Sequence, residues 1–398
     1  MVPELMTTTI GWSTHTDPLL AGREAAERAA RRLSLHAPKL AIVFGSSWFD
    51  QRLLVDGVRS ITGSTPLIGA STAGEIVPEG PISHSCVVVL IASNTLSIHV
   101  GMGEGMDRAP REAGRQAAAL AIRDFNGASR RGFLLLADGL FTSYADVIRG
   151  LQEVLGTSFL IVGGMAGDDL RFTQTYQYCN DRVMSRSVVG ALFGGPLTIG
   201  LGCEHGFAPI SKPRQITRSY ANVLIQLDGH PAASVYEEYF GHDVVERLRE
   251  EGLTRQGIAY PLGMRSETTG QWLLRNVVSF GEDGSLVCSG EVREGTWLQL
   301  MIGSKDLALE AAYKAAQQAT RSMNRIGCVL IFDSAVRRML LGSQHAALEI
   351  SRIREAIGPT VPLAGCYTYG EQAPLGTAMT YEQITTQTGS VLVVALGG

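Results

Sequence analysis

The 398-residue chain lacks the features that mark several large classes of protein. Its six cysteines include no CxxC pair, and its eight histidines show no HxxH or HExxH spacing, which argues against the usual zinc sites. No apolar run approaches the ~20 residues that cross a bilayer, so we expect no membrane insertion. The net charge of −4 is spread without long runs, which leaves no basic stripe for nucleic acid.

Motifs of catalysis are also missing. There is no GxSxG, no GxxxxGK[ST], and no kinase, cyclase or phosphodiesterase signature. The segment GMGEGM (101–106) imitates a nucleotide-binding glycine loop, but it lacks the third glycine at the right spacing. The N-terminus shows no secretory signal, and the scattered cysteines are typical of reduced thiols. We therefore expect a cytoplasmic protein that is not itself an enzyme.

What the chain does contain is one pattern three times over. Each copy has an apolar run typical of a strand buried on both faces, then a helix that ends in Gly, a second apolar run, a turn with Gly before an acid, and a closing apolar run. The turns are STAGE (71–75), GMAGD (164–168) and YTYGE (367–371). Upstream of each copy we expect a further strand and an Ala-rich helix, within 9–33, 97–121 and 297–319.

The pattern predicts an α/β fold in which repeated strand-helix-strand units form layered mixed sheets. Residues 197–295 interrupt it and predict an inserted, mainly antiparallel β segment, with tight turns at Asp228-Gly229 and Asp283-Gly284 and a helix ending at Gly241. We expect residues 1–36 to complete the first unit, residues 37–212 to hold two units, and residues 213–398 to hold the β-rich segment and the third unit.

Six segments in this order resemble the FIST family of sensory domains, with its N-terminal and C-terminal portions. They are PLIGASTAGEI (66–76), IVGGMAGDD (161–169), EHGFAPISKPRQIT (204–217), IQLDGHPAASVYEEYFG (225–241), LLRNVVSFGEDGSLVCSGEVREGT (273–296) and LAGCYTYGEQAPLG (363–376). The resemblance covers nearly the whole chain. It implies an intracellular sensor for small ligands such as amino acids or metabolites, acting through an effector such as a histidine kinase or a cyclic-dinucleotide enzyme.

Some members of the family resemble haem proteins that sense nitric oxide. The family often has a His-containing stretch before the last strand, whereas this chain has TTQTG (385–389), so no role for that His carries over. His205 lies beside Cys203 between glycine-rich turns, and it is the candidate axial ligand if haem binds. The alternative is a hydrogen-bonded structural histidine.

The candidate ligand site follows from the turns, because ligands of open α/β sheets lie outside the carboxyl ends of the strands. Glycine lets backbone approach a ligand, and tyrosine offers a flat wall with a polar tip. The predicted ligand-binding residues of the turns are Gly74, Glu75, Gly167, Asp168, Cys366, Tyr367, Tyr369, Gly370 and Glu371. Alternatively, each acid bonds its own backbone as part of the architecture.

Arg275 is a further candidate, because its guanidinium can pair with a ligand carboxylate; the alternative is a surface ion pair. Three functions stay open at this point. They are a small-ligand sensor acting through another protein, a haem-based sensor of nitric oxide, and an enzyme that uses the turn at 366–371. The ligand, the partner and the oligomeric state do not follow from the sequence.

Overall fold

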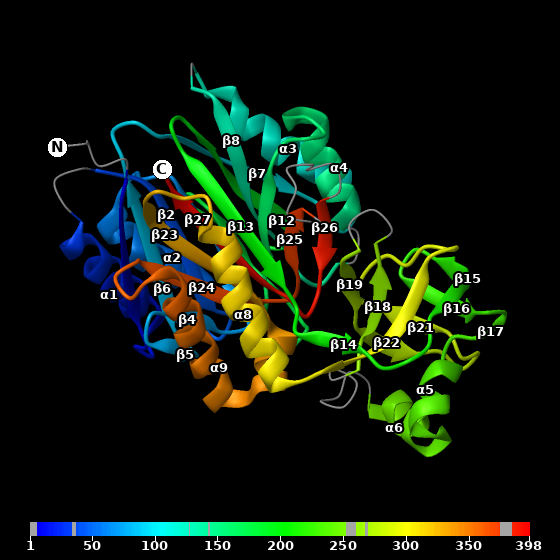
Figure 1. The fold of residues 1–398 in the computed structure, drawn as a ribbon. Coiled ribbons are helices and arrows are strands. Elements are labelled where there is room, and N and C mark those ends of the chain that lie inside the picture. Colours follow the sequence, from blue (N-terminus) through cyan, green and yellow to red (C-terminus); the bar gives the residue numbers. More distant parts are fainter. Residues whose placement is uncertain are drawn as a thin grey trace.

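The computed structural model of the chain describes residues 6–33, 37–126, 128–141, 144–251, 260–266, 270–374 and 384–398. A body of three sheets with helices on its outside carries a smaller β domain on one side (Figure 1). None of the helices in these ranges is both long and apolar enough to cross a membrane. The helices are α1 Pro18–Arg32, α2 Gln51–Thr62, α3 Pro110–Arg123, α4 Tyr144–Leu155, α5 Ser234–Phe240, α6 His242–Glu251, α8 Lys305–Thr320 and α9 Ala335–Ile357.

The body consists of three units with one connectivity. The strands of the first unit are β1 Thr7–Ser13, β2 Pro38–Ser46, β3 Leu67–Thr72, β4 Glu75–Val77, β5 Gly80–Ile82 and β6 Cys86–Ala92. Those of the second are β7 Ser97–Glu104, β8 Arg130–Ala137, β9 Ile161–Met165, β10 Gln177–Cys179, β11 Arg182–Met184 and β12 Ser187–Gly194. Those of the third are β13 Thr198–Glu204, β23 Ile326–Ser334, β24 Leu363–Thr368, β25 Glu371–Pro374, β26 Ile384–Gln387 and β27 Val391–Gly397.

Each unit builds four strands of a six-stranded sheet, in the orders β1-β6-β2-β3, β7-β12-β8-β9 and β13-β27-β23-β24. The last two strands in each order run parallel, and their other neighbours run antiparallel, so every sheet is mixed. The predicted fold class, with layered mixed sheets and an inserted antiparallel segment, is therefore confirmed.

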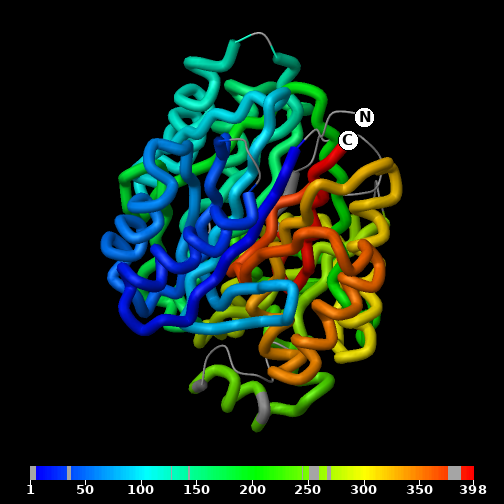
Figure 2. Tube along the Cα trace, turned by 90° about the vertical axis from the view of Figure 1, so that its left-hand side faces the viewer, coloured from blue at the N-terminus to red at the C-terminus, as the bar shows by residue number. Residues whose placement is uncertain are grey.

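Each sheet is completed by a hairpin from a different unit. Strands β10–β11 of the second unit join the first sheet, β25–β26 of the third join the second, and β4–β5 of the first join the third. The first unit (blue) consequently lies beside the third (orange) in Figure 2. Because every unit both gives and receives a hairpin, the three units interlock, and the turns that lead into the hairpins come together.

Small residues allow the outer helices to lie directly on the sheets. A Cβ atom at Gly101 of β7 would lie 2.0 Å from the carbonyl oxygen of Ala117 in α3. In the third unit a Cβ atom at Gly202 of β13 would lie 1.9 Å from the carbonyl oxygen of Ala315 in α8. The inner faces of the three sheets share one apolar core, in which Phe44 and Phe332 meet edge to face at 6.1 Å.

The prediction that residues 297–303 form the first strand of the third unit is wrong. That segment is β22, which pairs inside the β domain, and the first strand of the third unit is β13, paired with β27. The insertion falls between β13 and α8, so the strand just before α8 in sequence is the last strand of the insertion. The inserted sheet accordingly begins after β13, at β14 Phe207–Pro209, and not at residue 197.

The β domain is a nine-stranded antiparallel sheet with α5 and α6 at one side (Figure 1). The helix predicted to end at Gly241 is α5, and the turn at Asp228-Gly229 has φ of 50° and 80°, as its hairpin requires. Its further strands are β15 Arg214–Tyr220, β16 Val223–Leu227, β17 His230–Pro231, β18 Leu262–Arg265, β19 Trp272–Arg275, β20 Val277–Phe280, β21 Leu286–Cys288 and β22 Trp297–Gly303. A small apolar cluster joins the domain to α9; its members are Phe207, Trp272, Leu274, Met301, Val336 and Leu340.

Candidate functional site

The three predicted turns meet at the carboxyl ends of β3, β9 and β24. We call residues 71–75, 164–168 and 367–371 the corner cluster. Backbone hydrogen bonds connect its three parts in a ring: Gly167 N donates to Ser71 O at 3.0 Å, Ala73 N to Tyr367 O at 2.9 Å, and Tyr369 N to Met165 O at 3.2 Å. The sequence-predicted turn residues are thus brought together.

All three acids of the corner cluster are fully buried, and Glu75 and Glu371 each face a pair of Ser and Thr hydroxyl groups. Thr368 Oγ1 donates to Glu371 at 2.7 Å and Ser390 Oγ donates to its other oxygen at 2.5 Å. Glu75 receives the same pair of bonds, from Thr72 and Ser85. Burial raises the pKa of each carboxyl to about 8, against the opposing effect of the hydroxyl donors. Burial thus favours the neutral form of both side chains, which point into protein.

The counterpart of these acids in the second unit is Gln177, not Asp168 as the sequence pattern suggests. Strand register places Gln177 opposite Ala70, just as Glu75 lies opposite Cys366 and Glu371 opposite Gly164. The amide also keeps the pair of hydroxyl partners, since Ser187 donates to its oxygen at 2.9 Å and its nitrogen donates to Thr175 at 3.1 Å. A neutral amide at this position agrees with neutral carboxyls at the other two.

Asp168 anchors the loop that follows it. Its carboxylate accepts from the backbone N–H groups of Phe172, Thr173 and Gln174 at 2.6–2.9 Å, and from the hydroxyl of Tyr369. Burial by itself would raise the pKa of Asp168, but these hydrogen bonds outweigh it and lower the pKa. Asp168 is thus ionised and engaged in local structure.

The remaining corner residues are packed against protein. Tyr367 is fully buried below the guanidinium of Arg338, and Cys366 is buried with the pKa of its thiol well above the usual range because of desolvation. Tyr369 is half-buried and stacks on Phe172 at 4.8 Å. The glycines permit close packing: a Cβ atom would lie 1.6 Å from Arg338 at Gly74, 2.6 Å from Ala73 at Gly167 and 2.6 Å from Met165 at Gly370. Ligand binding by the corner cluster stays a prediction.

Arg275 lies in β19 of the β domain and is 5% exposed, so the alternative of a surface ion pair is wrong. Its Nε donates to the carbonyl of Glu291 at 2.9 Å and one terminal nitrogen donates to the carbonyl of Leu274 at 2.8 Å. Burial lowers the pKa of Arg275 to about 10. The guanidinium therefore caps backbone carbonyls.

His205 does not fit the axial ligand of a haem. Its Nδ1 accepts a hydrogen bond from the backbone N–H of Phe207 at 3.0 Å, which leaves the proton of the neutral ring on Nε2. A ligating histidine binds iron through one nitrogen while the other donates its proton, which is the opposite arrangement. Burial, together with the nearby charge of Arg337, lowers the pKa of His205 to about 4. The ring is a neutral structural acceptor, as the sequence alternative proposes.

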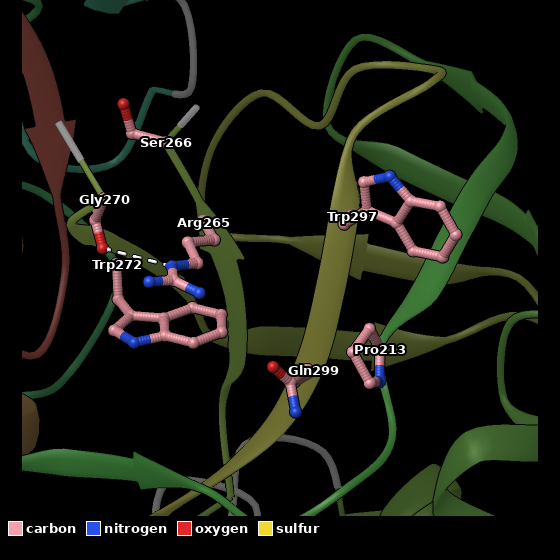
Figure 3. A pocket seen from close by; sticks show the side chains of 7 residues that line it. All are labelled: Pro213, Arg265, Ser266, Gly270, Trp272, Trp297 and Gln299. Carbon is pink, nitrogen blue, oxygen red and sulfur yellow. Dashed lines mark hydrogen bonds between the residues drawn. The ribbon is translucent and has the colours of Figure 1, made fainter. Parts of the chain in front are cut away.

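An open cavity of about 670 Å³ lies on the β domain. The strand alternation explains it: Met264 and Leu298 face the domain core, while their neighbours Arg265, Trp297 and Gln299 face the other side. Figure 3 shows the lining side chains, which are Pro213, Arg265, Ser266, Gly270, Trp272, Trp297 and Gln299. Sequence analysis missed this site, although the alternation in WLQL (297–300) signals one exposed face.

Arg265 lies between two tryptophans in a single row across three strands. On one side of β18, Arg265 pairs with Trp272 of β19. On the other side of β18, Met264 pairs with Leu298 of the antiparallel strand β22, which places Arg265 next to Trp297. Its guanidinium lies 5.9 Å from the centre of the Trp272 ring, and its Nε donates to Gly270 O at 3.4 Å. Among the described residues no carboxylate pairs with Arg265. The row can therefore receive an anionic group between aromatic surfaces.

Comparison with known proteins finds the FIST N domain over residues 39–230 and the FIST C domain over residues 232–374. Relatives include the uncharacterized proteins MJ1623 of Methanocaldococcus jannaschii, with 25% identity over 72% of this chain, and Rv0628c of Mycobacterium tuberculosis, with 26% identity over 92%. The match spans 58% of the length of the first relative and 94% of the second.

Among solved structures, a cyanuric acid hydrolase from A. caulinodans aligns over 99% of both chains with a TM-score of 0.36 and 11% identity. A second cyanuric acid hydrolase aligns with a TM-score of 0.37 and 10% identity, over 99% of this chain and all of the other. Likeness at this level supports no inference about activity.

Proposed function

Since the chain belongs to the FIST family of signal-transduction sensors, we propose that it is an intracellular sensor that binds a small ligand and signals through a separate effector protein. The observation that carries the proposal is the cavity of about 670 Å³ on the β domain. Sites for small molecules typically measure about 300–1,000 Å³ and combine aromatic walls with a few polar groups. The Trp272–Arg265–Trp297 row has this composition.

The position of the cavity suits a sensor, because one of its walls also belongs to the junction with the body. Trp272 packs against the buried residues of the apolar cluster that joins the β domain to α9, and Val336 and Leu340 of α9 pack against the same buried residues. A ligand that reorients the Trp272 ring would change this small contact. In the proposal, the change at the junction is the signal, and the effector is a histidine kinase or a cyclic-dinucleotide enzyme, the classes that the family resemblance implies.

The ligand in this proposal is an amino acid or another metabolite. The corner cluster serves as the rigid reference, since backbone hydrogen bonds connect its three parts and its acids are already hydrogen-bonded to protein groups. Direct contact of the corner residues with a ligand would require them to separate first. We therefore place the primary site in the cavity.

A thermal-shift screen of the full chain against amino acids and small metabolites tests the proposal. A true ligand at a concentration of 100 times its Kd stabilises the folded protein by about 2.7 kcal/mol. We expect Trp272→Ala and Trp297→Ala to abolish the shift. Trp48→Ala is the matched control, because Trp48 is exposed on the body, away from the cavity. Stabilisation that survives both cavity variants would contradict the assignment of the site.

A further inference from the structure

The chemistry of the cavity lining restricts what can bind there. Among the residues that the structure describes, seven line the cavity, and they include one cation, Arg265, and no acid. Arg265 is exposed, and the hydrogen bond from its Nε to Gly270 O holds one edge of the guanidinium. Its two terminal nitrogens are free of any described carboxylate partner. Such a fork matches a carboxylate or a similar planar anion in a bidentate arrangement.

The aromatic walls add a second requirement. Trp272 and Trp297 lie on strands with one strand between them, so their Cα atoms are about 10 Å apart, which is two strand spacings. A molecule with one ring, or with two fused rings, spans a distance of this order. Trp297 is 48% exposed, so a large part of its apolar surface faces solvent. In Figure 3 the guanidinium of Arg265 lies over the ring of Trp272, while the ring of Trp297 lies at the opposite side of the lining.

We propose that the cavity binds a flat organic anion, whose acid group pairs with Arg265 and whose ring lies on Trp272 or Trp297. This inference rests on the proposed function and names the class of its ligand. A cation would meet the charge of Arg265, and a neutral ligand would leave the guanidinium without a partner. An aliphatic anion would satisfy Arg265 but gain little from the indole faces, since offset stacking requires a second planar group.

Isothermal titration of the full chain with three matched probes tests the proposal. The probes are naphthalene-2-carboxylate, the neutral naphthalene-2-carboxamide, and cyclohexanecarboxylate, which is charged but not flat. We expect the first to bind at least tenfold more tightly than each of the others. Equal binding of the carboxamide would overturn the anionic requirement, and equal binding of cyclohexanecarboxylate would overturn the stacking requirement.

Two variants locate the effect. Arg265→Gln removes the cation and should bring the affinity for the naphthoate down to that of the carboxamide. Arg218→Gln removes an arginine from the exposed part of β15, outside the lining, and should leave all three affinities unchanged. Circular dichroism checks that both variants fold. An unchanged affinity of Arg265→Gln for the naphthoate would overturn the proposal.

The outcome also separates this inference from the proposed function. If the metabolite screen finds a cationic or aliphatic ligand that depends on Trp272 and Trp297, the class named here is wrong and the sensor function stands. If a flat anion binds tightly but leaves the amide hydrogen exchange rates of residues 335–341 in α9 unchanged, the ligand class stands and the signalling proposal fails.

Discussion

The guanidinium of Arg337 donates to the backbone carbonyl of His205 at 2.7 Å, although 132 positions separate the two residues. The same side chain donates to the carbonyl of Ala308 at 2.9 Å. His205 follows β13 and Ala308 lies in the first turn of α8, so Arg337 ties together the start and the end of the inserted β domain. Asp333 and Glu349, both fully buried like Arg337, bind its other N–H groups.

The first unit has no charges at the matching places. Asp333 occupies the same position in the strand register of β23 and β24 as Gly45 does in that of β2 and β3. Glu349 corresponds to Leu54, because each lies nine residues before the glycine that ends its helix. Gly45 and Leu54 touch directly, with the Leu54 methyl 2.5 Å from the position of a Cβ on Gly45. The buried ionic group thus occurs in the unit that carries the insertion, where two chain segments have to be held.

We expect Arg337→Met to cost about 3–5 kcal/mol of the free energy of unfolding, because it leaves two buried carboxyls without their cation. Urea denaturation measures this. Adding Asp333→Gly and Glu349→Leu rebuilds the apolar contact of the first unit and should recover most of the loss. Arg59→Met is the control, since Arg59 also donates to backbone carbonyls but lies in α2 of the first unit. A loss of stability no larger than that of the control would contradict this role of Arg337.

Glu75 and Glu371 should make stability fall as the pH rises. Their folded pKa of about 8 lies above the ordinary 4.5, so the folded protein holds protons that the unfolded chain releases. Their contribution to the free energy of unfolding is complete below pH 4.5, declines between pH 4.5 and 8, and is lost above pH 8. For each group, one unit of difference between the folded and unfolded pKa corresponds to about 1.4 kcal/mol. The double variant Glu75→Gln/Glu371→Gln, which copies Gln177, should flatten this part of the profile.

The measurement is urea unfolding between pH 5 and pH 8.5. Glu79→Gln serves as the control, since Glu79 is exposed and lies in the turn between β4 and β5. Its profile should match that of the unmodified chain. A double variant whose stability still falls with the slope of the parent between pH 5 and 8 would show that other groups govern the dependence.

The local elements followed from the sequence because each depends on a local pattern. Apolar runs marked the buried strands, and Gly63, Gly156 and Gly358, each with positive φ, ended the helices as expected. The exchange of hairpins did not follow, because nothing in a short strand such as Glu75–Val77 states which unit it will pair with. For the same reason the first strand of the third unit could not be predicted, because the inserted β domain separates β13 from α8 in the sequence.

The candidate site was predictable only in part. The pattern of Gly before an acid did bring the corner residues together, but it selected Asp168 over Gln177, because a loop separates Gln177 from the turn. The cavity was beyond local reasoning, since Arg265 and Trp297 become neighbours only through strand register. Burial decided the rest: a glutamate in a turn looks accessible in sequence, whereas Glu371 is fully buried under Ser390 and Thr368.

Gly101→Ala should destabilise the second unit. A Cβ atom there would lie 2.0 Å from Ala117 O, which forces α3 away from β7 and costs about 1–3 kcal/mol or more. Gly229→Ala is a useful comparison, since no atom lies within 4 Å of its Cβ position and only its φ of 80° is strained. Thermal unfolding should rank Gly101→Ala as the more damaging change. The reverse order would contradict the close contact.

Haem should show no bond to His205. The Nδ1 atom of His205 already accepts from Phe207 N–H, and burial keeps the ring neutral with its proton on Nε2, so ligation would have to break a local hydrogen bond and displace that proton. Absorption spectra of the chain titrated with haem should therefore be the same for the unmodified protein, for His205→Ala and for the surface control His84→Ala. A Soret band that shifts in His205→Ala alone would restore the haem-sensor function and show that the segment around Phe207 rearranges when haem binds.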